Sequence, residues 1–226
     1  GIKIMQLTQS SVGRKIIMAV TGFVLVAFVC VHLLGNSSLF FGADAINAYA
    51  QKLHSLGPFV WVFRLVMLAA FAIHIFFGIQ LTLENKAATP EKNVQVKRLK
   101  TGFGAETMVI SGLILLAFVI YHLLHFTVRV PGMGVYEMNE ATQMVNVYTM
   151  VVTAFMSLLK VAIYVIGMVF LFLHVGHGFQ SLFQTIGLSN DKSLPVMGLL
   201  SKLVAVVLLL GYISIPLLIV FGGIKL

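Results

Sequence analysis

Residues 16–34 read IIMAVTGFVLVAFVCVHLL and contain no Lys, Arg, Asp or Glu. A helix needs about 20 predominantly apolar residues to cross the hydrocarbon core of a membrane. The strands of a membrane barrel would alternate polar and apolar residues, which this stretch does not do. No small-residue cleavage site follows it, which argues against a secretory signal peptide. The stretch therefore predicts a membrane-spanning α-helix.

Four further stretches have the same character, so the sequence predicts five spans. Of the 226 residues 59% are hydrophobic and only 10% are charged, whereas a soluble domain has about 45–50% and 25%. The composition excludes a water-soluble fold, a disordered chain, a disulfide-stapled secreted domain and a nucleic-acid binder. We expect an all-α integral membrane bundle forming one domain over residues 1–226, with spans at about 16–36, 58–83, 105–128, 147–183 and 200–224.

The basic residues of the connections predict the orientation of this bundle, because cytoplasmic loops carry an excess of Lys and Arg. Three lie on one side, in the first connection, the third connection and the C-terminus: Lys52, Arg129 and Lys225. Ten lie on the other side: Lys3, Arg14, Lys15, Lys86, Lys92, Lys97, Arg98, Lys100, Lys192 and Lys202. This imbalance predicts a cytoplasmic N-terminus and an external C-terminus.

Four histidines fall within four different spans, where ionisable residues are costly and usually functional. His32 and His122 lie in the outer halves of outward-running helices, and His74 and His174 lie in the inner halves of inward-running ones. The helical rise places these pairs at two depths, about 15–20 Å apart along the membrane normal. Neutral imidazole is a common axial ligand of haem iron. The pattern predicts two stacked haem sites, each held by one pair.

Small residues accompany these histidines at equal offsets within each pair. Gly22 and Gly112 each stand ten residues before the histidine of the same span, while Gly78 and Gly178 each follow theirs by four. A flat macrocycle between helices requires such missing side chains. The equal offsets support the pairing of His32 with His122 and of His74 with His174.

Other interpretations of the histidines stay open. An intramembrane histidine is often an interhelical hydrogen-bond donor. His125 and His177 each follow a chosen ligand by three residues on a similar helix face, so either could replace it. Depth favours His122 and His174, and we expect His177 to point toward the cytoplasmic edge of the inner haem. His54 precedes the second span and is an interfacial residue or part of a quinone site.

Two cationic residues lie in the outer halves of spans, Arg64 and Lys160. Their long side chains can extend to the outer headgroups. Alternatively, they are charge partners for the propionates of the outer haem.

The opening motifs, residues 11–15 (SVGRK), 21–22 (TG) and 32–36 (HLLGN), resemble the five-helix di-haem cytochrome b subunit of succinate dehydrogenases and fumarate reductases. The stretch 174–181, HVGHGFQS, is the most specific part of this resemblance. The outer loop around residues 47–53 also fits, and the likeness covers nearly the whole chain.

The resemblance implies a multi-pass anchor in the bacterial cytoplasmic membrane, which docks a flavoprotein with covalent FAD and an iron–sulfur subunit on the cytoplasmic side. Electrons would pass between the iron–sulfur chain and menaquinone through two haems b. It implies His74 and His174 as inner-haem ligands, and His32 and His122 as outer-haem ligands. By position, the haem surroundings would include His177, Ser181, Gly22, Gly112, Arg64 and Lys160, and those of the quinone Asn47, Tyr49, His54 and Arg64.

One position departs from some relatives, which have a glutamate two residues before the fourth-span ligand. Here that residue is Phe172, and no Asp or Glu lies within the apolar body of any span. A transmembrane proton path would therefore use water, propionates or histidine. The direction, succinate oxidation or fumarate reduction, stays open.

Two alternative functions are the cytochrome b anchor of another respiratory dehydrogenase and a small transporter with a histidine-lined path. The transporter hypothesis predicts polar residues on the helix faces that carry the histidines. The residues there are mainly Gly, Leu, Val and Phe, which suit a haem.

Overall fold

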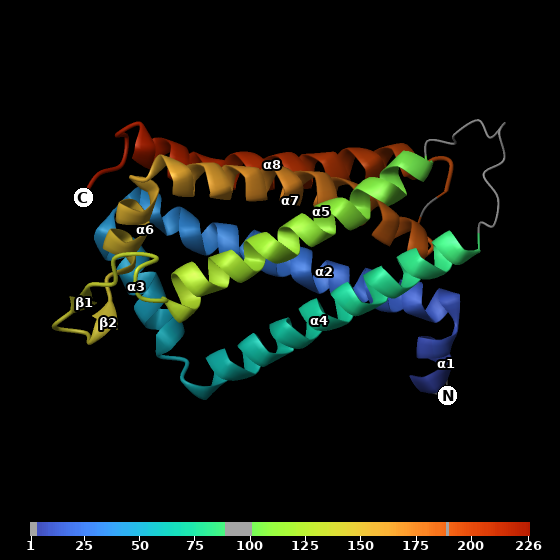
Figure 1. Cartoon of the computed structure of the whole chain (residues 1–226), viewed down its shortest axis with the longest axis horizontal. Coiled ribbons are helices and arrows are strands. Elements are labelled where there is room, and N and C mark those ends of the chain that lie inside the picture. The colour runs from blue at the N-terminus through green and yellow to red at the C-terminus, as the bar shows by residue number, and fades with distance from the viewer. Residues whose placement is uncertain (1–3, 89–100, 189) are drawn as a thin grey trace. The chain divides into compact units, whose positions relative to one another are not determined.

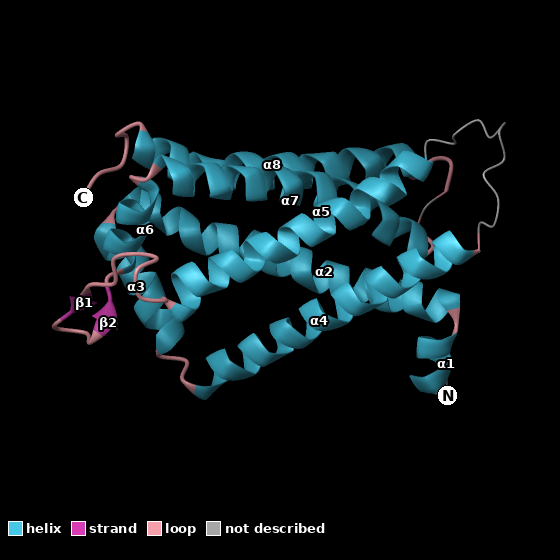
Figure 2. Cartoon of the chain, viewed as in Figure 1, coloured by secondary structure: helices cyan, strands magenta, loops and turns pink. Residues whose placement is uncertain are grey.

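The computed structural model describes residues 4–88, 101–188 and 190–226 of the chain. It is almost entirely helical, with one small hairpin (Figure 2). Five basic residues that enter the prediction of orientation lie outside the described residues: Lys3, Lys92, Lys97, Arg98 and Lys100.

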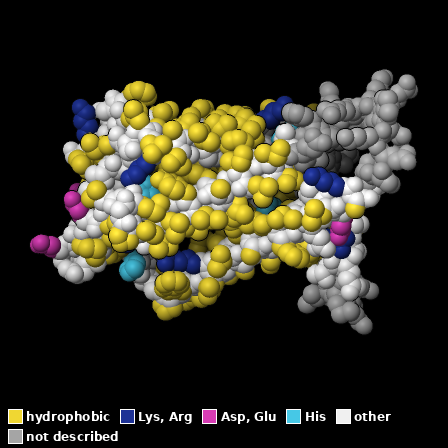
Figure 3. Space-filling model, viewed as in Figure 1, with side chains coloured by type: hydrophobic (Ala, Val, Ile, Leu, Met, Phe, Trp, Pro, Cys, Tyr) yellow, Lys and Arg dark blue, Asp and Glu magenta, His cyan; other side chains and the backbone are white. Residues whose placement is uncertain are grey.

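The part of the chain that the structure describes contains five helices that are long and apolar enough to cross a membrane (Figure 1). Hydrophobic side chains cover most of their visible faces (Figure 3), as expected of helices that face lipid. The all-α class and the expected number of long apolar helices are thus confirmed. The helices are α2 (Ser11–Asn36), α4 (Pro58–Ala87), α5 (Thr101–His122, continued by the π-helix Leu123–Val128), α7 (Leu158–Thr185) and α8 (Leu194–Val220).

The fourth predicted span, residues 147–183, is not one helix. The structure divides it into α6 (Val147–Phe155) and α7, separated at Met156 and Ser157. A single helix of that length would extend about 55 Å, whereas the hydrocarbon core of a membrane is about 30 Å thick. The apolar run therefore contains a short helix in addition to the spanning one.

Short elements also form outside the predicted spans. They are α1 (Ile4–Gln9), a 3₁₀ helix (Ser37–Phe41), α3 (Ala43–His54) and an antiparallel hairpin of β1 (Met138–Asn139) and β2 (Met144–Val145). The first predicted connection on the outer side is thus mostly helical. Gly42, between the 3₁₀ helix and α3, has a φ of 98° that favours glycine.

The contacts divide the chain into two compact units, each built from parts of the long helices. Unit 1 comprises residues 1–28, 64–113 and 173–205, and unit 2 comprises residues 29–63, 114–172 and 206–226. The expectation of one domain over the whole chain stays a prediction. Unit 2 contains the hydrophobic cluster of Leu39, Ile46, Val152, Phe155, Val161, Tyr164, Ile215 and Ile219.

Candidate functional site

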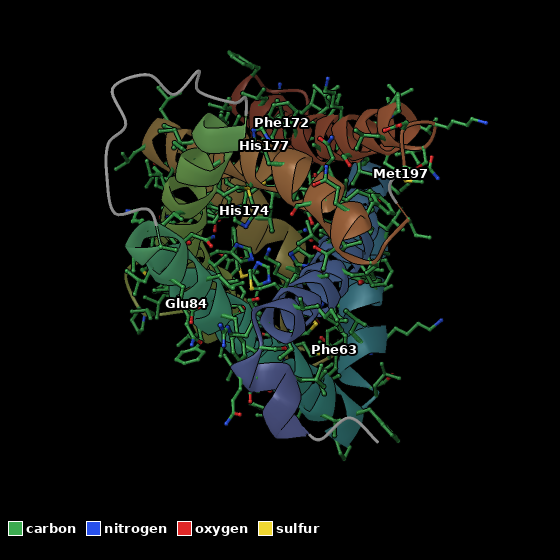
Figure 4. All side chains as sticks on the ribbon, turned by 90° about the vertical axis from the view of Figure 1, so that its right-hand side faces the viewer. Phe63, Glu84, Phe172, His174, His177 and Met197 are labelled. Carbon is green, nitrogen blue, oxygen red and sulfur yellow. The ribbon has the colours of Figure 1, made fainter. Side chains whose placement is uncertain are left out.

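Unit 1 contains two of the predicted haem ligands side by side. The ring centres of His74, on α4, and His174, on α7, are 6.3 Å apart, and the ring planes are inclined by 75°. Figure 4 shows His174 on the side of α7 that faces the other helices. A metal ion bonded to an imidazole nitrogen about 2 Å away on each side would separate the ring centres by about 6 Å. The spacing of the two rings therefore suits a shared metal ion.

A hydroxyl group from a neighbouring helix contacts each of these histidines. The hydroxyl oxygen of Thr21, on α2, lies 3.1 Å from Nδ1 of His74. The hydroxyl oxygen of Ser111, on α5, lies 3.1 Å from Nδ1 of His174. Each hydroxyl donates its one proton to a carbonyl in its own helix, at 2.8 Å for Thr21 and 3.1 Å for Ser111. The hydroxyl oxygen is then left to accept the Nδ1–H of the histidine. This leaves the Nε2 lone pair of each ring available to a metal.

Two glycines leave room for the rings of this pair. A Cβ atom on Gly22 would lie 3.4 Å from Cε1 of His74, and one on Gly112 would lie 3.2 Å from Cε1 of His174. The sequence analysis used the offsets of these glycines from His32 and His122 only to support the pairing, whereas in the fold the glycines lie next to the rings of the other pair. Ten residues of a helix span about 15 Å, so a glycine cannot contact a histidine so far along the same helix.

Thr21 and Ser111 are functional candidates whose contacts with the histidines were not predicted from the sequence. An internal repeat was the signal that could have found them. Residues 18–34, MAVTGFVLVAFVCVHLL, and residues 108–124, MVISGLILLAFVIYHLL, share the pattern Met-x₂-Thr/Ser-Gly-x₉-His-Leu-Leu. Residues 74–80 and 174–180 share His-x₃-Gly-x-Gln. The equivalent position of each hydroxyl in the repeat indicates an equivalent role.

Unit 2 contains the other predicted pair. The ring centres of His32, on α2, and His122, at the end of α5, are 5.9 Å apart, with an angle of 83° between the rings. His122 also stacks on Phe118, at 6.0 Å and 24°. The ring of Tyr212, on α8, lies 6.3 Å from that of His32. Of the two alternatives considered from the sequence, the structure places His122 rather than His125 next to His32.

The Tyr164 hydroxyl lies between two histidine rings in unit 2. It is 3.3 Å from Nδ1 of His122 and 3.0 Å from Nδ1 of His125. His125 lies within the π-helix and has no exposed surface. Tyr164 thus contacts the same ring nitrogen of His122 that the hydroxyl residues contact in the pair of unit 1.

Other residues expected around a haem are exposed or have other partners. His177 (Figure 4) is exposed on α7 after His174. Ser181, farther along the same helix, is also exposed. Lys160 donates from Nζ to the carbonyl of Met133 at 2.6 Å, and so holds the loop that precedes the hairpin. Arg64 is exposed on α4.

The residues expected near a quinone lie in and around α3. The Asn47 side-chain oxygen accepts from the first two backbone N–H groups of α6, at 2.8 and 3.3 Å, and its amide donates to Asn146 at 3.0 Å. Asn47 therefore joins α3 to the start of α6. The Tyr49 ring packs against Gly35, where a Cβ atom would collide with its hydroxyl. His54 is the last residue of α3 and is exposed.

The donor set suits a haem better than a bare metal ion. Among the described residues, no group of three or more His, Cys, Asp or Glu side chains could hold a metal ion, whereas a structural zinc site needs four such ligands. Haem iron requires only two axial ligands from the protein. The free Nε2 lone pairs and the glycines beside the rings of unit 1 fit that requirement.

Comparison with known protein families finds a match over part of the chain. Residues 8–105, slightly less than half of the chain, match the model of the succinate dehydrogenase/fumarate reductase transmembrane subunit. The matched stretch includes Thr21, Gly22, His32 and His74. Neither a curated protein nor a solved structure matches the chain.

Proposed function

Taking the chain as a transmembrane subunit of the succinate dehydrogenase/fumarate reductase family, we propose that it is the di-haem cytochrome b anchor of such a complex. It carries electrons between the iron–sulfur subunit and menaquinone through two haems b. The observation that carries this proposal is the presence of two histidine pairs, with ring centres 6.3 and 5.9 Å apart, each drawn from two long helices.

In this proposal His74 and His174 hold the inner haem, and His32 and His122 hold the outer one. A bound haem supplies one-electron chemistry, because its iron can be ferric or ferrous. The chain contributes ligand orientation. Thr21 keeps the Nδ1 proton of His74 in place and directs Nε2 toward the metal, as Ser111 does for His174.

The proposed orientation places the N-terminus in the cytoplasm, where the flavoprotein and the iron–sulfur subunit dock. The excess of basic residues in the N-terminal segment and in the second and fourth connections supports this orientation. The membrane is then the bacterial cytoplasmic membrane, and the inner haem is the one nearer the iron–sulfur subunit. Phe172, two residues before His174, supplies no carboxyl group for a proton path on α7 (Figure 4).

The test is a dithionite-reduced minus oxidised absorption spectrum of the purified complex, with haem quantified per polypeptide. We expect two b-type haems in the wild type and one in His74→Ala, because this variant lacks one of the two ligands of the inner haem. His54→Ala is the matched control, because His54 is exposed at the end of α3 and should leave both haems bound. A wild-type complex without haem, or a His74→Ala complex that retains both, contradicts the proposal.

A second pair of variants separates the two neighbouring histidines of α7. His177→Ala should retain both haems, since His177 is exposed, while His174→Ala should lose the inner one. If the losses are reversed, His177 is the ligand. The subunits that copurify with the chain distinguish this family from another respiratory dehydrogenase.

A further inference from the structure

His125 is a fully buried histidine that the proposed function leaves without a role. It has no exposed surface, and its Nε2 has no hydrogen-bond partner among the residues that the structure describes. Burying a polar group without full pairing is costly, so each such group in a folded protein calls for an explanation. On the other side of the ring, Nδ1 is hydrogen-bonded to the Tyr164 hydroxyl at 3.0 Å.

The local structure holds the His125 ring in one place. The π-helix Leu123–Val128 contains it, and π-turns within helices are frequent at functional sites. The ring stacks on Phe126 at 4.0 Å and 20°. The Tyr136 hydroxyl donates to the His125 carbonyl at 2.8 Å. Burial raises the pKa of Tyr136, so this hydroxyl stays a donor.

The hydrogen bonds around Tyr164 follow from the proton count. A phenol hydroxyl has one proton to donate and oxygen lone pairs to accept. When His122 binds a metal through Nε2, its Nδ1 carries a proton, which it donates to Tyr164 across 3.3 Å. The Tyr164 proton then goes to Nδ1 of His125, at 3.0 Å. The three side chains therefore form a chain of hydrogen bonds that starts at His122 and ends at His125.

From this geometry, and resting on the proposed function, we infer that Tyr164 is a positioning residue for the haem ligand His122 and that His125 acts on that ligand through Tyr164. An acceptor for Nδ1–H orients a ligating imidazole and raises its basicity. A more basic ligand stabilises ferric over ferrous iron and lowers the reduction potential. Hydrogen bonds in series strengthen one another, so His125 adds to the effect of the Tyr164 hydroxyl.

The first experiment is a redox titration of the purified complex, followed by haem absorption. Tyr164→Phe removes the hydroxyl and keeps the ring, which belongs to the core of unit 2. We expect the ferric-to-ferrous ratio of the outer haem to fall about tenfold at a given potential, which corresponds to an upward shift of about 59 mV. The inner haem should keep its potential. The ferric electron paramagnetic resonance signal of the outer haem should also change, because the His122 ring is released.

A thermodynamic cycle tests the role of His125 and separates it from simple packing. His125→Leu should raise the outer-haem potential in the wild type but leave it unchanged in Tyr164→Phe, where the connection is already broken. His125→Gln, which retains an acceptor for the Tyr164 proton, should restore much of the wild-type potential. Equal shifts by His125→Leu in both backgrounds would mean that His125 acts by packing, and would overturn its inferred role.

The outcomes distinguish this inference from the proposed function. If the wild-type complex contains two haems and Tyr164→Phe leaves their potentials unchanged, the inference is overturned and the proposed function stands. A wild-type complex without haem overturns the proposed function and the inference with it. If Tyr164→Phe loses only the outer haem and the helix content and the inner haem are retained, the positioning role is supported, and the comparison of His125→Gln with His125→Leu still measures the part played by His125.

Discussion

In the proposed function, replacing Thr21 by Val should weaken binding of the inner haem while leaving the outer haem in place. Val has nearly the shape of Thr but lacks its hydroxyl. The variant therefore keeps the packing of α2 and removes the oxygen that lies 3.1 Å from Nδ1 of His74. The Nδ1–H of His74 then has no hydroxyl to accept it.

The expected magnitude depends on how much water can replace the lost acceptor. Interhelical hydrogen bonds in membranes contribute about 0.6 kcal/mol on average, whereas an orphaned buried donor costs about 1–3 kcal/mol. The larger range applies here because Thr21 is only 8% exposed, and its lower end allows for the Met18 backbone, a second hydrogen-bond partner of His74. A tenfold change in an equilibrium constant corresponds to 1.36 kcal/mol, so inner-haem affinity should fall by about 5-fold to 150-fold. This agrees with the 10–100-fold loss that follows removal of the hydrogen-bond partner of a metal-ligating residue.

The assay is haem content per polypeptide after purification, together with the potential of each haem in a redox titration. Thr21→Ser is the matched control, because it keeps the hydroxyl and should retain the inner haem. Ser111→Ala should repeat the effect through His174. If Thr21→Val retains both haems at unchanged potentials, the hydroxyl does not orient His74 and the reasoning is refuted.

Three other variants test the packing and polar contacts, each by thermal unfolding in detergent. Gly167→Ala places a Cβ atom in the Phe118 ring and should cost about 1–3 kcal/mol through overpacking; an unchanged midpoint would show that the ring can move away. Asn47→Ala removes three hydrogen bonds that join α3 to α6 and should cost about 1–3 kcal/mol, with Asn47→Asp, which keeps the accepting oxygen, less affected. Glu84→Gln breaks the 2.7 Å ion pair with Arg14, but Glu84 is 41% exposed and Arg14 keeps two carbonyl partners. The loss should therefore stay below about 1 kcal/mol and shrink with added salt.

The sequence was informative about the spans and about which histidines belong together. Long uncharged runs predict membrane helices because the bilayer dictates their length. The depth of each histidine along its helix follows from the helical rise alone, and the structure has His74 beside His174 and His32 beside His122. These predictions depend on one helix at a time, which is why they need no knowledge of packing.

Features that depend on contacts between helices could not be predicted in the same way. The sequence shows only that Gly22 stands ten residues before His32 on α2, whereas across the helices Gly22 faces His74. Asn47 was a position-based candidate for a quinone site, and its hydrogen bonds to α6 become visible only in the fold. The break at Met156 lies in a continuous apolar run, so hydrophobicity carries no signal for it.

The internal repeat has a consequence for assembly. The first copy, α2 and α4, carries His32 and His74, and the second copy, α5 and α7, carries His122 and His174. Each pair takes one histidine from each copy, so neither copy alone could supply both histidine ligands of one haem iron. In the proposed function every haem is a cross-link between the two copies, and cofactor insertion waits until α7 has been synthesised and inserted. A ligand that binds only the folded state also stabilises it, so the two haems would hold together even a chain cut between α4 and α5.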